Sequence, residues 1–302
     1  MIKLTRVGAR IEVKTMNLCD IKNIKQIMSV FGIKFHKEFG QNFLTNKMVV
    51  EDIAEYCCEG RSNTILEIGP GIGTLTCELA ERYDKVIALE IDRGLIPVLS
   101  YTLDGYDNVT VINEDVMKTD LEALLAPYFE GGVSVCANLP YYITTPILMK
   151  LLESRLPFDY ITIMIQSEVA DRLCAKAGSK DCGAITAVLS YYGEAEKLFT
   201  VNADNFMPPP KVNSSVVRIR LYKDKPCKPK DEELFFRVIK AAFEQRRKTL
   251  LNALSASFPE LSKDKLAEVI ERAGHRPDIR GEKLDVAQFC TLSDLLSELK
   301  NS

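Results

Sequence analysis

Residues 65–76, which read ILEIGPGIGTLT, constrain the fold of this 302-residue chain more than any other stretch. The run Thr64–Ile68 has the apolar, β-branched composition of a strand buried in a parallel sheet. Gly69, Gly71 and Gly73 follow directly, and a helical apolar periodicity begins after them. A strand, a tight glycine turn and a helix in this order are typical of a site for an adenosine-containing ligand. The alternative is a turn that only packs a helix against a strand.

Further short, β-branched runs predict the rest of a sheet. They lie at 86–91, 109–113, 133–137 and 160–165, with helical or loop material between them. This spacing predicts a doubly wound, mostly parallel α/β sheet. Two more strands, at 196–201 and 215–221, are joined by a loop that contains Pro208-Pro209-Pro210, and we expect them to close the sheet as a hairpin. The segment HKEFGQNFL (36–44) is predicted to be a loop, and helices are predicted at 21–31, 46–58 and 183–192.

A proline- and lysine-rich segment, KDKPCKPK (223–230), predicts a domain boundary. Beyond it lie helical patterns at 232–254, as one helix or two, and at 263–273 and 285–299. We therefore expect three parts: a poorly ordered N-terminal extension (1–20), an α/β domain (21–224) and a smaller all-α domain (225–302).

The charge of the chain is unevenly distributed, although the net charge is only −3. Residues 1–50 carry nine basic and three acidic side chains, residues 51–203 carry eleven and twenty-four, and residues 204–302 carry nineteen and fifteen. Two basic ends around an acidic middle favour a polyanionic partner that is held by the ends. The alternative is a set of solvated surfaces without a partner.

Cysteine and histidine usage indicates the compartment and argues against a metal centre. The nine cysteines form no CxxC pair, and only two histidines are present. This pattern predicts reduced thiols and no metal site. With no secretory signal and no apolar run that could span a bilayer, we expect a cytoplasmic protein.

Acidic residues end the second and third predicted strands. Glu90 is positioned to accept hydrogen bonds from ribose hydroxyls, with Asp92 as the competing candidate and a plain surface acid as the alternative. Asp115 is positioned to accept from an adenine amino group or, alternatively, to cap the next segment. Thr74 stands where a dinucleotide fingerprint has its third glycine, which favours S-adenosylmethionine over NAD.

The stretch Asn138-Leu139-Pro140-Tyr141 follows the fourth predicted strand and indicates the reaction. The exocyclic nitrogen of adenine is a poor nucleophile because its lone pair is delocalised into the ring. An oxygen of Asn138 and the carbonyl of Leu139 can accept both amine protons and favour a pyramidal nitrogen. Pro140 stiffens the turn, and Tyr141 can stack on an extracted base. The alternative is a proline turn with a core tyrosine.

The motifs HKEFGQNFL, ILEIGPGIGTLT, ALEID, NLPYYITTPIL, NFMPPPKVNSSVVRI, AFEQRRKTLLNAL and RGEKLDVAQF resemble, in this order, the bacterial small-subunit ribosomal RNA adenine N6,N6-dimethyltransferase family. The resemblance covers about residues 20–300. It implies a class I, Rossmann-like methyltransferase with a seven-stranded sheet and a helical RNA-binding domain. Such an enzyme uses S-adenosyl-L-methionine to dimethylate two adjacent adenines of small-subunit (16S) RNA within the 30S particle, and we expect it to be a monomer.

The resemblance also implies roles for single residues. Asn42 and Leu44 contact the cofactor, Gly69 lies under its methionine part with Gly71 in the same turn, Glu90 holds the ribose, Asp115 holds the adenine, and Asn138 lies at the reacting amine. Phe206 is the second aromatic face opposite Tyr141. These assignments make Asn138, Leu139, Pro140, Tyr141 and Phe206 the predicted catalytic set.

Candidate RNA contacts are basic residues near both ends of the chain. The set is Lys34, Lys37, Lys211, Arg246, Arg247 and Lys248. The alternative for the triplet 246–248 is a solvated helix end. Three other functions stay open: a large-subunit (23S) RNA methyltransferase of the macrolide-resistance type, a non-catalytic ribosome assembly factor and, more distantly, a nicotinamide dehydrogenase.

Overall fold

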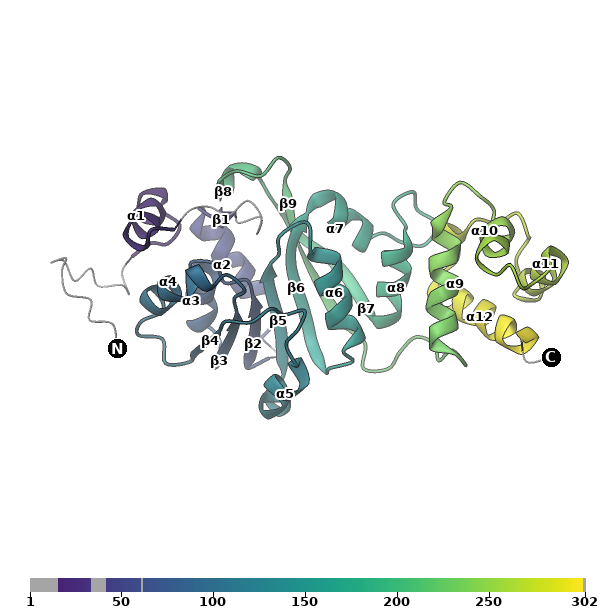
Figure 1. Ribbon diagram of the computed structural model, residues 1–302, viewed down its shortest axis with the longest axis horizontal. Helices are drawn as coiled ribbons and strands as arrows, with labels where there is room; N and C mark the ends of the chain where they lie inside the picture. Colours follow the sequence, from purple (N-terminus) through teal and green to yellow (C-terminus); the bar gives the residue numbers. More distant parts are fainter. Residues whose placement is uncertain (1–15, 34–41, 61, 301–302) are drawn as a thin grey trace. The chain divides into compact units, whose positions relative to one another are not determined.

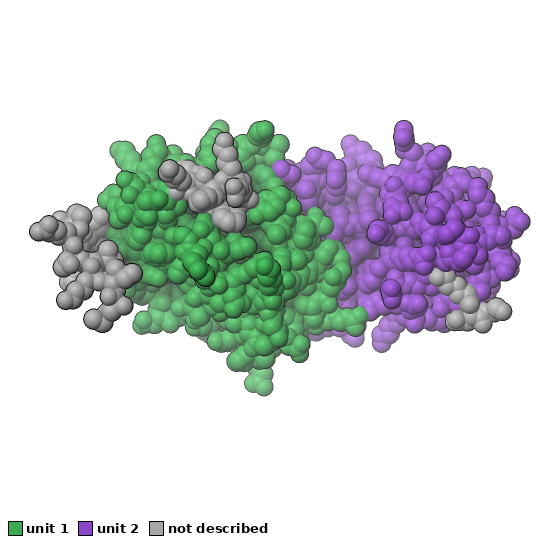
Figure 2. All heavy atoms as spheres, in the orientation of Figure 1, with its two compact units in different colours: residues 1–165, 201–214 green, residues 166–200, 215–302 purple. Residues whose placement is uncertain are grey.

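A computed structural model describes residues 16–33, 42–60 and 62–300. Contacts between Cα atoms divide the chain into two compact units, coloured separately in Figure 2. The first unit contains residues 1–165 and 201–214, and the second contains residues 166–200 and 215–302. The expected boundary between residues 224 and 225 stays a prediction. Of the expected N-terminal extension, residues 1–15 lie outside the described part, whereas Leu18 and Cys19 are buried.

A seven-stranded sheet has the strand order β4-β3-β2-β5-β6-β9-β7 (Figure 1). The five strands from β4 to β6 are paired in parallel, and β2 is buried along its whole length. The sheet confirms the predicted class I methyltransferase fold, and each predicted run falls on a strand. The strands are β2 (Thr64–Ile68), β3 (Lys85–Leu89), β4 (Val109–Ile112), β5 (Val133–Asn138), β6 (Phe158–Gln166), β7 (Gly193–Val201) and β9 (Ser214–Leu221).

Strands β7 and β9 run in opposite directions and form the predicted hairpin. Arg218 pairs with Glu196, and Arg220 pairs with Glu194. Residue numbers therefore increase along β9 while those of the partners decrease along β7, which is antiparallel pairing. Antiparallel pairing needs only a short connection, and a parallel pair would need a crossover. The hairpin makes the sheet mixed.

The first helix of the first unit begins and ends at residues with capping chemistry. Asp20 caps the first turn of α1 by accepting from Lys22 N, and Gly32 ends this helix with a φ of 65°. The helices are α1 (Ile21–Phe31), α2 (Lys47–Tyr56), α3 (Thr74–Ala80), α4 (Ile96–Thr102), α5 (Leu121–Leu125) and α6 (Thr144–Glu153), with 3-10 turns η3 (Arg93–Leu95), η4 (Ala126–Gly131) and η5 (Ala203–Asn205).

Two predicted loops contain short strands. Strand β1 (Phe43–Leu44) pairs antiparallel with β8 (Phe206–Met207), so the loop predictions for these four residues were wrong. Two-residue strands carry no periodicity, and the partners are about 160 residues apart in the chain. Local sequence therefore gives no signal for this pairing.

The second unit contains the C-terminal helices. The pattern at 232–254 forms two helices, because the backbone leaves the helical conformation at Gln245. At the start of α12, Asp285 and Gln288 exchange backbone-to-side-chain hydrogen bonds and so form a capping pair. The helices are α7 (Ser167–Leu173), α8 (Ala184–Tyr192), α9 (Glu232–Glu244), α10 (Leu250–Ser257), α11 (Lys263–Arg272) and α12 (Val286–Lys300), with the 3-10 turn η6 (Gly281–Lys283). Among the described residues, no helix has the length and apolar character needed to cross a membrane.

Candidate active site

A cavity opens at the carboxyl ends of the parallel strands β2, β3, β4 and β5, where α/β sheets bind their ligands. All of its lining residues belong to the first unit. The cavity brings together all eleven predicted catalytic and cofactor-binding residues, which are Asn42, Leu44, Gly69, Gly71, Glu90, Asp115, Asn138, Leu139, Pro140, Tyr141 and Phe206. Apolar side chains that also line the cavity include Leu75, Leu89, Ile91 and Leu95.

The glycine turn between β2 and α3 needs its glycines for conformation and for space. Gly69, Gly71 and Gly73 have φ values of 74°, 61° and 90°, which residues with a Cβ rarely adopt. A Cβ at Gly71 would lie 3.2 Å from the Phe43 ring, and one at Gly73 would lie 2.9 Å from Thr102 Oγ1. The turn is therefore packed tightly against β1 on one side and α4 on the other.

Glu90 lies directly after β3 and is 4% exposed. Its Oε2 accepts from Gly71 N at 3.1 Å, and its Oε1 accepts from Asp92 N at 2.8 Å. Burial raises the pKa of Glu90 to about 7. The competing Asp92 does not line the cavity, and its side chain caps η3 by accepting from Gly94 N. Of the two candidate acids, Glu90 is therefore the one that lines the cavity.

Asp115 lies three residues after β4, where it lines the cavity and also makes the capping bond; its ligand-binding role stays a prediction. Its Oδ1 accepts from Met117 N at 2.9 Å. The capping bond engages Oδ1, and the side chain is 25% exposed. A capping role and a ligand-binding role are thus compatible in one carboxylate.

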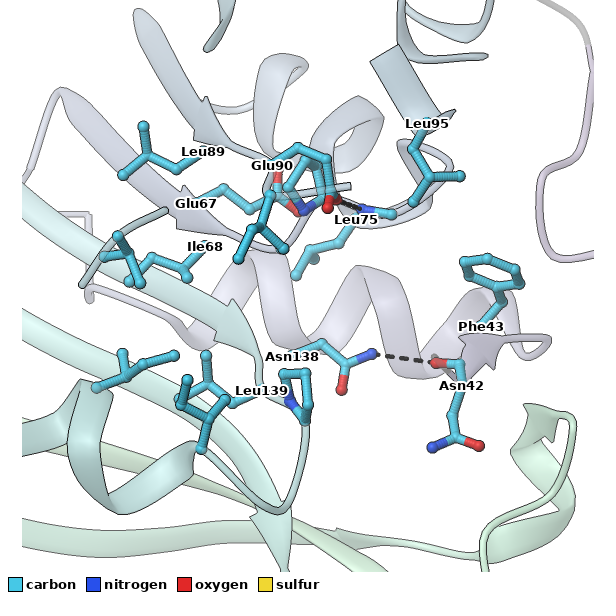
Figure 3. Close-up of a pocket in the computed structure, with 18 of the residues that line it drawn as sticks. Asn42, Phe43, Glu67, Ile68, Leu75, Leu89, Glu90, Leu95, Asn138 and Leu139 are labelled. Carbon is cyan, nitrogen blue, oxygen red and sulfur yellow. Dashed lines mark hydrogen bonds between the residues drawn. The ribbon is translucent and has the colours of Figure 1, made fainter. Parts of the chain in front are cut away.

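Asn138 ends β5 and begins the predicted methyl-acceptor site. Its Nδ2 donates to the Asn42 backbone oxygen at 3.4 Å, and its Oδ1 is turned away from Asn42 (Figure 3). Leu139 is buried, and its backbone N–H donates to Met164 O on the neighbouring strand. Tyr141 shares a hydrogen bond of 2.8 Å with Ser214 Oγ. The turn is thus fixed at three points to other segments of the first unit.

Comparison with known proteins decides the family. The model for the family described as ribosomal RNA adenine dimethylase matches residues 32–298. Ribosomal RNA small subunit methyltransferase A of Geobacillus thermodenitrificans is 46% identical over 279 residues, 91% of this chain and 95% of the relative. Its counterpart from Lachnoclostridium phytofermentans is 46% identical over 285 residues, 93% and 98% of the two chains. This chain belongs to the ribosomal RNA adenine dimethylase family. The predicted family and enzyme class are confirmed, and the nicotinamide dehydrogenase alternative is not.

Solved structures agree with this assignment. A dimethyladenosine transferase from Plasmodium falciparum superimposes with a TM-score of 0.69 at 26% identity, covering 86% of this chain and 98% of that one. The 23S rRNA methyltransferase ErmE superimposes with a TM-score of 0.66 at 24% identity, covering 85% and 100%. The similarity to ErmE shows that the two proteins share a fold.

Glu67 is a cavity residue of this dimethylase that our sequence analysis missed. It lies on β2, is 1% exposed, and its Oε2 has no hydrogen-bond partner among the described residues. Burial, with a smaller contribution from the charge of Glu90, raises the pKa of Glu67 to about 8. An acid within the apolar run TILEI was the available signal, because burying a carboxyl is costly and such groups cluster at functional sites.

The candidate RNA contacts are placed in part. Lys34 and Lys37 lie outside the described residues. Lys211 is exposed and belongs to the first unit, whereas Arg246, Arg247 and Lys248 are exposed on the turn between α9 and α10 of the second unit. Arg246 also has a structural role, because its Nη2 donates to the backbone oxygens of Lys180 and Cys182 at 2.8 and 2.9 Å. Described His, Cys, Asp and Glu side chains form no cluster of three that could hold a metal ion.

Proposed function

We propose that this dimethylase transfers methyl groups from S-adenosyl-L-methionine to the N6 amines of two adjacent adenines in small-subunit (16S) ribosomal RNA. The observation that carries this proposal is the position of the Asn138–Tyr141 turn in the same cavity as the glycine turn and Glu90. One segment offers acceptors for an amine, and the other two have the chemistry of an adenosine site. In this proposal a methyl donor and its acceptor take adjoining places in one cavity.

The cofactor half of the cavity fits S-adenosylmethionine. The glycine turn lets backbone groups approach the methionine part near Gly69 and Gly71. Glu90 offers carboxylate oxygens to the ribose hydroxyls, and Asp115 offers one to the adenine amine. The sulfonium group of the cofactor supplies the methyl group. In our proposal Asn42 and Leu44 complete this half from β1 and the residue before it.

The acceptor half fits an adenine that has been taken out of its stack. The side-chain oxygen of Asn138 and the carbonyl oxygen of Leu139 accept the two amine protons, which makes the nitrogen lone pair available. Pro140 holds the turn that orients these oxygens. Tyr141 and Phe206 line the same cavity and offer aromatic faces to the base. No strong general base is needed, because the amine becomes acidic once it is methylated.

The small-subunit substrate is supported by the relatives at 46% identity, which are named small subunit methyltransferases. We infer that the chain acts as a monomer on the 30S particle in the cytoplasm. Lys34, Lys37, Lys211 and the triplet 246–248 are the proposed contacts to RNA phosphates. The helical region from residue 225 onwards is the proposed RNA-binding domain.

The test is transfer of labelled methyl groups to undermethylated small subunits and, separately, to large subunits. We expect incorporation into adenines of the small subunit only. Asn138→Ala should reduce transfer about a hundredfold or more, the effect of losing one preorganised polar group at a reacting centre. Incorporation into large subunits would support the macrolide-resistance alternative. Binding to small subunits without cofactor binding in calorimetry would support the non-catalytic assembly factor instead.

A further inference from the structure

The β1–β8 ribbon joins the two halves of the proposed active site. Its registered pairs are Phe43 with Met207 and Leu44 with Phe206. One residue beyond the ribbon, Thr45 N donates to Asn205 O at 2.8 Å. Two strands of two residues each bury little surface and form few ladder bonds, so the ribbon needs support from neighbouring side chains.

Asn46 and Asn205 supply that support at the end of the ribbon. The Nδ2 of Asn46 donates to Asn205 Oδ1 at 2.9 Å, and both side chains are partly buried. The other end of the Asn46 amide caps α2, because its Oδ1 accepts from Met48 N at 3.1 Å. A helix cap needs only this oxygen, and Asp or Ser would serve equally well. The amide nitrogen therefore gives Asn46 a second function, because it donates to Asn205, the residue before Phe206.

Each strand of the ribbon belongs to a different half of the site. On the β1 side, the ring of Phe43 packs against the glycine turn, and the Asn42 oxygen accepts from Asn138. On the β8 side, Phe206 lines the cavity as the proposed aromatic face for the base. A displacement of β8 relative to β1 would move this ring without changing the cofactor half.

We propose that Asn46 and Asn205 are positioning residues for the methylation reaction, which hold Phe206 at the target base by locking β8 to the strand that borders the cofactor. This inference rests on the proposed function, because it requires that an adenine is captured beside Phe206. It adds a pair of residues that do not line the cavity. Their effect on catalysis is confined to the capture of RNA.

Two isosteric variants separate this role from general stability. Asn46→Asp keeps the oxygen that caps α2 and loses the N–H that reaches Asn205. Asn205→Asp keeps the oxygen that accepts from Asn46 and loses only the bond from its own Nδ2 to Asn202 O. Both variants add one negative charge at nearly the same place, so repulsion of RNA phosphates is matched between them. The difference between the two variants therefore reports the Asn46–Asn205 hydrogen bond.

The measurements are KM for undermethylated small subunits, kcat, the Kd of S-adenosylmethionine for the free protein, and Tm. For Asn46→Asp we expect a KM about two- to tenfold above that of Asn205→Asp, the range for one neutral hydrogen bond. We expect the cofactor Kd of both variants to stay within about twofold of wild type, because the cofactor half is unchanged.

Equal KM values for the two variants would overturn the inference and leave the proposed function intact. A second pattern would also overturn the inference: in Asn46→Asp alone, KM rises, cofactor affinity falls by the same factor, and Tm is lower. This pattern indicates a general structural effect. Failure of the wild type to methylate either ribosomal subunit would overturn the proposed function and this inference together.

Discussion

The cavity of the first unit and the basic turn of the second unit hold their polar groups in opposite ways. In the cavity, Glu90 is 4% exposed and accepts two backbone hydrogen bonds, so its position is fixed before any ligand arrives. On the turn, Arg247 and Lys248 are exposed at the end of α9. Buried, preorganised groups suit chemistry, whereas exposed cations suit a phosphate backbone. We therefore expect salt to weaken binding of RNA strongly and binding of the cofactor little.

The largest effect expected on ligand binding tests the preorganised groups of the cavity. Glu90→Ala should raise the Kd of S-adenosylmethionine about tenfold or more, because hydrogen bonds to a charged acceptor contribute more than neutral ones. Asp92→Asn is the matched control, since Asp92 lies two residues away and does not line the cavity. Titration calorimetry on both variants measures the difference. Equal losses of affinity would mean that Glu90 acts only through the geometry of its loop.

A smaller effect sharpens the side of the basic turn. Arg247→Ala should weaken binding to small subunits several-fold and reduce the slope of log K against log salt by about 1, without changing Tm. Arg246→Ala should weaken binding and also lower the free energy of unfolding by about 1–3 kcal/mol, because two backbone oxygens lose their donor. Filter binding at several salt concentrations and thermal unfolding distinguish the two. An unchanged salt slope in Arg247→Ala would contradict the phosphate contact.

The last effect is on stability alone and concerns pH and the buried acid of the cavity. Glu67 releases its proton at an ordinary pKa of 4.5 in the unfolded chain and at about 8 in the folded protein. Within this window the folded protein binds more protons, so the contribution of Glu67 to stability declines as the pH rises from about 5 to 8. Glu67→Gln should therefore flatten the decline in Tm of the cofactor-free protein over this pH range. The free energy of unfolding should fall less between pH 5 and pH 8 than in wild type, by an amount on the order of 1–3 kcal/mol.

Thermal unfolding of wild type and Glu67→Gln at pH 5.5, 6.5, 7.5 and 8.5 measures this difference. Glu90, whose pKa is also raised, contributes in the same direction in both proteins. Because the two carboxyl groups interact, the difference between the profiles also includes their coupling. Parallel Tm profiles for the two proteins would show that Glu67 is ionised across the whole range.

Sequence reasoning succeeded where the signal is local. Thr64–Ile68 and Ile21–Phe31 are found with the predicted bounds, because composition, caps and periodicity lie within each segment. Asn138 was identified from its place after an apolar run, and the cavity contains it as expected. The strands beside Glu90 and Asp115 end one or two residues earlier than predicted, since frayed ends carry little signal.

Sequence reasoning missed what depends on distant partners. Neither Phe43 nor Met207 has neighbours that indicate a strand, and their pairing exists only once the unit has folded. The structural bonds of Arg246 join the α9–α10 turn to the loop before α8, which no local pattern of charges reveals. Glu67 was visible as an acid in a buried strand, but a single residue does not interrupt the strand pattern and was passed over.

The long separation of β1 and β8 also has a consequence for synthesis of the protein. All five parallel strands lie before residue 167, so they can leave the ribosome and pair while translation continues. The partner of Phe43 is residue 207, and closing so long a loop is a late, slow event. A nascent chain would thus have its glycine turn and its Asn138 well before it could hold a base beside Phe206. Methylation competence therefore requires at least the first 207 of the 302 residues.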